Sequence, residues 1–419
     1  MEDLMIFISK SLLGWLVIQV CLTLVFIWYV KSHQPKVLAN EQLPKTAVIL
    51  CLRGADPFLP TVIRSLLRQD YPQYDLKIII DSPEDPAYTI VKEAIAQIQG
   101  TNVQISTLRA VRHNCSLKCN ALIQAVSDLD ESYKAIALID ADTVVHPTWL
   151  RELVSPLIDS QVGVTTGNRW YVSNGNYWGS LVRFSGNVST VVQMFLFGIP
   201  WGGSLAMKTE VLHRIELLDK WEQTLCDDLF IPKLLKAHGL KVQFVPSLLM
   251  VNREECDLPR CLENLKRLII SARFYHPAWL AIVSETISSI LFPSILILLM
   301  IESLLQAELY VMSLLFSAYS FYTIGILLLM LLMEVSIQPI IQAQGQYPTP
   351  ISLKHSVRLL IAIPLTQWMY GLAMLSSVVI SKVTWRGINY RLQSAMEITL
   401  VEYQPYQWLD QPIDPKISL

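Results

Sequence analysis

The hydrophobic residues of this chain follow two different patterns. Four long apolar runs cover about Leu12 to Val30, Leu280 to Ile301, Leu309 to Met333 and Val357 to Ile380. Each is long enough to cross a bilayer, which takes about 20 apolar residues in a helix. Between the first run and the second lies a stretch in which short apolar segments alternate with amphipathic ones. This order predicts an anchor, then a folded domain outside the bilayer, then a bundle of membrane helices.

Charges around the first apolar run predict its orientation. Glu2 and Asp3 precede it, Lys31 and Lys36 follow it, and no small-residue cleavage site is evident. A secretory signal would carry its basic residues before a shorter apolar stretch. We therefore expect a retained anchor, and the positive-inside rule puts the following domain in the cytosol.

The side on which the chain ends is open at this point. Four spans would place the C-terminal residues opposite the cytosolic domain, yet Lys382, Arg386 and Arg391 follow the last run, and basic residues prefer the cytosol. In the alternative, one late segment is re-entrant or lies along the interface. The expected division of the chain is an anchor and linker (1–43), a cytosolic domain (44–277), membrane helices (278–382) and a tail (383–419).

Composition agrees with a protein that is partly solvated by lipid. The 419 residues are 52% hydrophobic and only 16% charged, whereas soluble domains carry about 25% charged residues. The net charge of -2 gives no indication of nucleic-acid binding. The seven cysteines are scattered and form no CxxC pair, which argues against a zinc ribbon.

The region 44–277 reads as an α/β domain. Short apolar runs at Thr46 to Leu52, Leu76 to Ile80 and Lys134 to Ile139 have the composition of buried strands, and 58–69 and 89–99 show helical spacing. Strands that alternate with helices predict a mostly parallel sheet covered on both faces. In such sheets, ligands bind beyond the carboxyl ends of the strands.

Three carboxylates stand directly after these predicted strands. Asp81 follows one strand, and Asp140 and Asp142 follow another with DxD spacing. Each alone could be a turn former or a helix cap. Together they favour a site for a hard cation, Mg²⁺ or Mn²⁺, which prefers oxygen ligands and commonly bridges substrate phosphates. Such a cation would neutralise a diphosphate leaving group.

Two further segments carry candidate chemistry. Asp227 and Asp228 precede an apolar stretch, where they would serve either as helix caps or, for one of them, as a general base. Lys118 and Asn120 stand near the start of a predicted helix, where Lys118 is either a phosphate contact or simply solvated.

Seven motifs give the chain a resemblance to family 2 glycosyltransferases of the GT-A fold, above all to ceramide glucosyltransferases and bacterial hopanoid-associated glycosyltransferases. They are RGADPFLPTVIRSLLRQDYPQYDLKIII, DSPEDPA, LKCNAL, LIDADTVVHPTWL, IPWGGSLAMKTEVL, CDDLF and, after the last apolar run, WRGINYRL. The resemblance implies a GT-A catalytic domain in 44–277 and Asp228 as catalytic base. It implies Asp142 as the metal ligand. Nucleotide-sugar contacts are implied for Asp81, Lys118, Asn120, Asp140 and Arg267, and acceptor-side roles for Gly202, Gly203, Ser204 and Asp227.

One family motif is incomplete. Members usually carry (Gln/Arg)-x-x-Arg-Trp before the membrane helices, but here Asn264, Arg267 and Leu268 occupy these positions, so the Gln and the Trp are missing. A shifted register would use Arg273 and Phe274 instead. The missing Trp weakens the expectation of a processive enzyme, in which the motif holds a growing chain.

The function expected from the resemblance is transfer of a hexose from a nucleotide-sugar, a UDP-sugar above all, to a ceramide- or hopanoid-like lipid, in glycolipid biosynthesis. The expected partners are the donor, the lipid and the membrane, with a bacterial inner membrane favoured over the Golgi. One alternative is a processive polysaccharide synthase with the same donor site. The other is an inactive membrane protein that only binds nucleotide-sugar.

Overall fold

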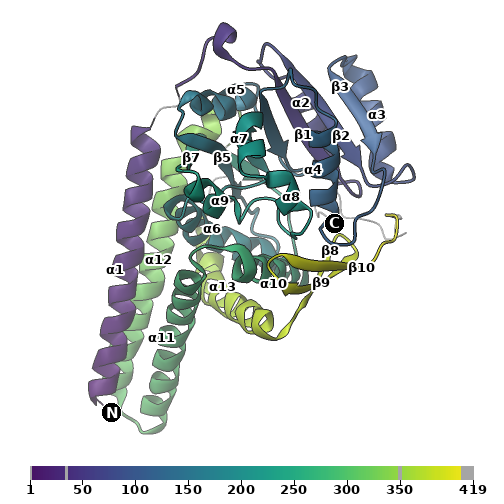
Figure 1. The fold of residues 1–419 in the computed structure, drawn as a ribbon. Coiled ribbons are helices and arrows are strands. Elements are labelled where there is room, and N and C mark those ends of the chain that lie inside the picture. The colour runs from purple at the N-terminus through teal and green to yellow at the C-terminus, as the bar shows by residue number, and fades with distance from the viewer. Residues whose placement is uncertain (1, 34–35, 348–351, 407–419) are drawn as a thin grey trace.

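The computed structural model describes residues 2–33, 36–347 and 352–406. An α/β domain sits at one end, and long apolar helices project from it (Figure 1). A seven-stranded sheet in the order β3-β2-β1-β4-β6-β5-β7 forms the centre of that domain. The predicted α/β fold class, with a mostly parallel sheet and an all-α helical region, is confirmed.

The first half of the sheet is wholly parallel. Strands β1 (Thr46–Leu52), β2 (Tyr74–Ile80), β3 (Val103–Thr107) and β4 (Ala135–Ile139) alternate with helices α2 (Leu59–Leu66), α3 (Pro86–Ile98) and α4 (Leu117–Ser127). Asp85 caps α3 by accepting from Ala87 N at 2.9 Å, and Ser116 caps α4 by accepting from Cys119 N at 3.1 Å. Such caps satisfy backbone N–H groups that a helix start leaves unpaired.

The second half of the sheet is mixed. Strand β6 (Ser204–Lys208) runs antiparallel to both β4 and β5 (Val162–Tyr171), and β5 pairs in parallel with β7 (Lys241–Asn252). The helices of this half are α5 (Trp149–Val154), α6 (Trp178–Leu196), α7 (Thr209–Arg214), α8 (Leu217–Trp221) and α9 (Ile231–Ala237).

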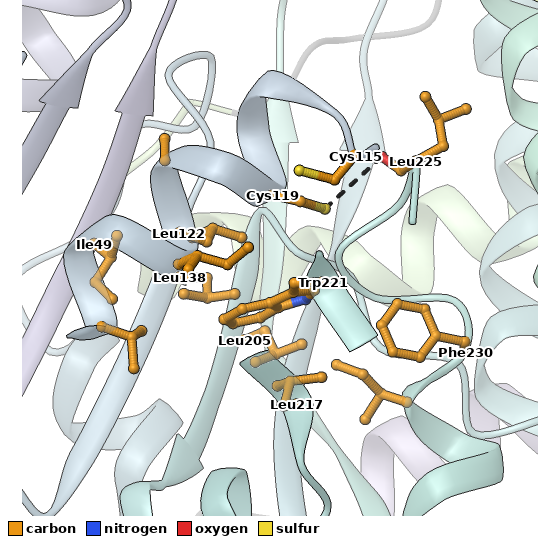
Figure 2. Close-up of a cluster of buried hydrophobic side chains, with 14 of the residues drawn as sticks. Ile49, Cys115, Cys119, Leu122, Leu138, Leu205, Leu217, Trp221, Leu225 and Phe230 are labelled. Atoms are coloured by element: carbon orange, nitrogen blue, oxygen red, sulfur yellow. Dashed lines mark hydrogen bonds between the residues drawn. The ribbon is translucent and has the colours of Figure 1, made fainter. Parts of the chain in front are cut away.

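Apolar side chains fill both faces of the sheet. On one face, Leu122 of α4, Leu138 of β4 and Leu205 of β6 pack around the fully buried Trp221 of α8 (Figure 2). The indole N–H of Trp221 donates to the carbonyl of Asp227 at 3.0 Å. The core therefore fixes the backbone of the acidic pair that the sequence singled out.

Among the described residues, four helices are long and apolar enough to cross a membrane: α1 (Glu2–Ser32), α11 (Trp279–Leu305), α12 (Leu309–Ala343) and α13 (Leu353–Val379). Helices α1, α11 and α12 project away from the sheet, whereas α13 lies beside α10 (Leu258–Tyr275) (Figure 1).

Contacts with the α/β domain occur near both ends of α13. Near its start, the Arg358 guanidinium donates to the carbonyl of Gly175, and near its end the carbonyl of Ser377 accepts from Arg273 of α10. Between them, Met369 and Ala373 pack with Val182 of α6. Helix α13 therefore packs along the domain over much of its length, and the side on which the chain ends stays open.

Residues 382–402 form a separate three-stranded sheet of β8 (Lys382–Trp385), β9 (Ile388–Ser394) and β10 (Glu397–Glu402). We call it the C-terminal sheet. It packs on the α/β domain, where the hydroxyl of Tyr390 accepts from Leu117 N at 3.2 Å and Leu400 N donates to His113 O at 2.7 Å. The described part of the segment expected as a tail thus returns to the domain, and the division of the chain at 383 stays a prediction.

Candidate active site

Lys118 lies at the centre of a network of carboxylates. It stands in the first turn of α4, and its Nζ lies 2.8 Å from Asp140 Oδ1 and 2.9 Å from Asp227 Oδ2. Burial alone would lower the pKa of Lys118, but the charges of Asp140 and Asp227 outweigh it and hold that pKa well above its usual value. A permanent cation therefore joins the DxD segment to the downstream acidic pair.

The two aspartates of the DxD segment have different environments. Burial acts to raise the pKa of Asp140, but the ammonium of Lys118 outweighs it, so that pKa is lowered. Burial, the charge of Asp140 and that of Glu254 together raise the pKa of Asp142 to about 6. Asp142 Oδ2 accepts from Asn252 Nδ2 at 3.1 Å, and Thr143 Oγ1 donates to its Oδ1 at 3.2 Å. Lys118 thus pairs with Asp140, whereas the cation whose charge opposes the shift at Asp142 is Arg169.

This environment suits a bound divalent cation. A carboxylate that is buried beside other negative charges is stabilised by a cation, and its oxygens are the ligands that Mg²⁺ and Mn²⁺ prefer. Within the described part of the chain, no three His, Cys, Asp or Glu side chains converge as a ligand cage. One or two carboxylates are the usual protein share when substrate phosphates supply the other ligands.

Asp228 is held by the glycine-rich segment before β6. Its Oδ2 accepts from the backbone N–H of Gly202 at 2.8 Å. A side chain on Gly202 would collide with Asp227, and one on Gly203 would reach the ring of Trp201 and, at 2.7 Å, Asp140 Oδ2. Close approach of the backbone to these carboxylates therefore requires glycine at both positions.

The acidic pair is not a helix cap. Helix α9 begins only at Ile231, and its start has no hydrogen bond from a capping side chain. Burial and the neighbouring Asp227 raise the pKa of Asp228 to about 7, despite the opposing effect of Lys118. A carboxylate with such a pKa is matched to proton transfer near neutral pH.

Asp81 lies at the end of β2 and pairs with Arg53, which directly follows the adjacent strand β1. Burial raises the pKa of Asp81 even though Arg53 opposes the shift. Arg53 Nε donates to the carbonyl of Arg386 at 2.8 Å, and its Nη2 donates to that of Gln404 at 2.9 Å. The C-terminal segment thus contacts the predicted nucleotide region directly.

The tip of the β8–β9 hairpin reaches into this site. Arg386 and Gly387 both have positive φ, 49° and 77°, in a two-residue turn between the paired Trp385 and Ile388. Arg386 Nη2 lies 2.8 Å from the buried Asp56 Oδ2. A left-handed conformation is unfavourable for Arg, and these contacts offset its cost of about 1–2 kcal/mol.

Two further arginines add positive charge. Arg267 of α10 lies with its guanidinium 4.8 Å from the ring centroid of Trp385 and donates to Asn264 Oδ1 at 2.9 Å. The motif in α10 lacks its Trp after Arg267, but Trp385 of the C-terminal sheet places an indole against the Arg267 guanidinium. Arg169 of β5 lies over Tyr171 and Trp201, at 5.4 and 5.5 Å, and its pKa is raised, because the nearby Tyr171 and Asp142 outweigh burial.

Two predicted site residues form hydrogen bonds with other protein groups. Asn120 accepts from Arg112 Nη1 at 3.0 Å and donates to Ala110 O at 2.8 Å, which holds the loop before α4. Ser204 Oγ accepts from the indole of Trp149 at 2.9 Å and lies fully buried in β6. Both side chains therefore stabilise the frame of the site, and direct substrate contact by either stays a prediction.

Sequence reasoning missed several residues of the site: Arg53, Asp56, Arg169, Asn252 and Arg386. A signal existed for three of them. Arg53 follows a predicted strand as directly as Asp81 does, Asp56 lies in the RGADPF turn, and Arg386 lies in the WRGINYRL motif. Arg169 and Asn252 gave no local signal, because their positions depend on how distant strands pair.

The mostly parallel sheet, the strand-end carboxylates and the apolar helices together define the class, a glycosyltransferase with several candidate membrane helices. The family model "Glycosyl transferase family 21" matches residues 11–398, so the chain belongs to that family. The predictions of an enzyme and of this kind of glycosyltransferase are thereby confirmed.

Individual relatives give more limited likenesses. A ceramide glucosyltransferase from Pyricularia oryzae is 34% identical over 67 residues, which are 16% of this chain and 14% of that relative. A mannosyltransferase from Pyrobaculum calidifontis, solved with GDP-Man and Mn2+, is similar with a TM-score of 0.48 and 13% identity over 89% of this chain and 99% of its own. The structure of GalNAc-T7 with UDP, GalNAc and Mn2+ is similar with a TM-score of 0.38 and 13% identity, over 51% of this chain and 44% of its own. At these scores neither structure bears on substrate or metal.

Proposed function

We propose that this glycosyltransferase moves a hexose from a nucleotide-sugar, a UDP-sugar above all, to a lipid hydroxyl at the cytosolic face of a membrane. The observation that carries the proposal is the partly buried network in which Lys118 pairs with both Asp140 and Asp227. The charges of these two carboxylates act on Asp142 and Asp228 respectively. The apolar helices that project from the domain support a membrane-borne acceptor.

In the proposed reaction, the acceptor oxygen attacks the anomeric carbon as the bond from that carbon to the diphosphate breaks, with inversion. Asp228 accepts the proton of the hydroxyl, and its pKa of about 7 suits this role. The sugar passes through an oxocarbenium-like state. Two hydrogen bonds orient the Asp228 carboxylate: the backbone N–H of Gly202 donates to it, and the indole of Trp221 donates to the carbonyl of the preceding Asp227.

The donor end would be held by two groups of residues. Asp81 and Arg53 face the nucleoside, and Arg267 and Arg169 supply positive charge for the diphosphate on which negative charge develops. A divalent cation held by Asp142 would add Lewis-acid stabilisation of the leaving group when it is bound. Lys118 keeps Asp140 ionised and joins the donor side to the acceptor side.

Product analysis tests the proposal. The purified full-length protein would be incubated with labelled UDP- and GDP-sugars and a lipid extract, and the products analysed by mass spectrometry, with Asp228→Asn as the inactive control. We expect one hexose per lipid. Long carbohydrate products would support a processive synthase, and donor binding with no product in the wild type would support an inactive binding protein.

A further inference from the structure

A cavity of about 430 Å³ lies between α1, α6, α11, α12 and α13. This volume falls in the range of about 300–1,000 Å³ that is typical of ligand pockets. The α11 residues that line it run from Ala281 to Ile290, in the half of α11 that follows the α/β domain. Its α6 residues belong to the catalytic domain, whereas its lining on α1 (Trp15 to Thr23) and α12 (Tyr322 to Met330) lies midway along those helices. The cavity therefore extends from the catalytic domain into the helical bundle.

The lining is mostly apolar but contains polar groups on several helices. They include Gln19 of α1, Ser185 of α6, Glu285 of α11 and Gln367 of α13. Gln19 Oε1 and Ser185 Oγ are buried and have no hydrogen-bond partner among the described residues. Unpaired polar groups are costly among apolar helices. They indicate a ligand that donates hydrogen bonds from within an otherwise apolar molecule.

Two segments connect this cavity to the active site. Gly186 lines the cavity, and the next residue, Asn187, binds the backbone of Tyr171 through both its amide groups, at 3.1 and 2.6 Å. Tyr171 packs under Arg169, which lies near Asp142. Phe197 also lines the cavity, five residues before Gly202, which binds Asp228.

We propose that this cavity binds the acceptor lipid by the alkyl chain next to its head, and that Gln19 and Ser185 accept hydrogen bonds from a hydroxyl or amide N–H of that lipid. This inference rests on the proposed function. An alkyl chain gains little hydrophobic energy on leaving a bilayer for an apolar cavity, because lipid tails are equally apolar. Selectivity for the acceptor over bulk phospholipid therefore comes from the polar groups.

Photolabelling tests occupancy directly. Full-length protein in phosphatidylcholine nanodiscs would receive a trace of a ceramide, or of a phosphatidylcholine, with a photoreactive acyl chain. We expect the ceramide probe to label peptides of α6 and α11, and the double substitution Ser189→Phe/Ser288→Phe to cut this labelling at least tenfold. Ser317→Phe, the same change on the exposed side of α12, is the matched control. Equal labelling by both probes would mean that ordinary bilayer lipid fills the cavity and would overturn the proposal.

A second variant does not depend on filling the cavity. Gln19→Leu removes an unpaired buried oxygen, so thermal stability should be unchanged or higher, while KM for the lipid should rise about fivefold or more. A KM equal to that of the wild type would count against the polar role. If the wild type binds the ceramide probe here but glycosylates no lipid, the proposed function fails and the binding site stands. If the wild type glycosylates lipid and the Ser189→Phe/Ser288→Phe variant keeps the same kcat/KM, the assignment of the cavity is wrong and the proposed function stands.

Discussion

The edge of the parallel strands and the C-terminal sheet contribute to the same site by different routes. Asp81, Asp140 and Asp142 directly follow strands whose apolar runs are evident in the sequence. Arg386 and Trp385 arrive from more than 240 residues beyond the DxD segment, at the tip of a hairpin that follows the last apolar helix. The first region supplies carboxylates and the second supplies a cation and an indole.

The difference between the two regions lies in what holds their functional groups. The strand-end carboxylates are fixed by a sheet with large apolar cores on both faces. The strands that flank the hairpin tip belong to one of these cores through Val383, Ile388 and Tyr390, but Arg386 at the tip is itself held by polar contacts, to Asp56 and, through its carbonyl, to Arg53. We expect the first region to determine whether the reaction occurs and the second to tune how the donor is held.

The largest expected effect is that of Asp228→Asn. Loss of a general base typically costs about 10²–10⁴ in rate, so kcat should fall by about three orders of magnitude while the donor Kd stays within about twofold. Turnover and donor binding by calorimetry are the two measurements. Asp219→Asn, at an exposed position on α8, is the matched control. Normal turnover in Asp228→Asn would remove this carboxylate from the mechanism.

Asp142→Ala tests the metal assignment. Loss of groups that merely orient a metal ligand costs about 10–100-fold, so loss of the ligand itself should weaken Mn²⁺-dependent donor binding by more than about 100-fold. Asn252→Ala, which removes the hydrogen bond to Asp142 Oδ2, should fall within the smaller range. Titrations with and without Mn²⁺ distinguish the two. Equal affinity in Asp142→Ala and the wild type would exclude this carboxylate as the ligand.

The sequence predicted the edge of the parallel strands well and the arrangement of the C-terminal sheet poorly. The apolar run Thr46 to Leu52 coincides with β1, and the predicted strands before Asp81 and Asp140 agree with β2 and β4 to within two residues. These features are local, because a buried parallel strand is a continuous apolar run. The insertion of β6 between β4 and β5 and the return of residues 382–402 are long-range pairings that no local pattern encodes.

Individual side chains show the same limit. Asn120 and Ser204 stand in motifs that resemble the family, yet their hydrogen bonds go to Ala110 and Trp149. Residue type told us that each needed a polar partner if buried, but only the fold determines which one. Conversely, the indole that packs on Arg267 comes from Trp385, 118 residues further along the chain, and not from the adjacent position, where this chain has Leu268.

The pH dependence of the reaction tests whether Asp228 acts in its ionised form. With a pKa of about 7, the carboxylate that accepts the proton is mostly lost in acid, and kcat/KM should fall about tenfold per pH unit below 7 and level off above it. The same raised pKa means that the folded state binds more protons than the unfolded state between the usual carboxyl value and 7. This group therefore makes stability decrease as pH rises through that window. A flat kcat/KM from pH 5 to 8 would contradict the assignment.

The smallest effect should come from the C-terminal sheet. Trp385→Leu removes the indole from Arg267 and keeps an apolar side chain at the strand end. Cation–π contacts contribute about 0.5–2 kcal/mol, so KM for the donor should rise by about 2- to 30-fold with kcat nearly unchanged. Trp368→Leu, half-exposed on α13, is the matched control for loss of an indole. If Trp385→Leu instead abolished kcat as Asp228→Asn is expected to, the hairpin would belong to the catalytic machinery itself, and the division between a reacting edge and a tuning sheet would be wrong.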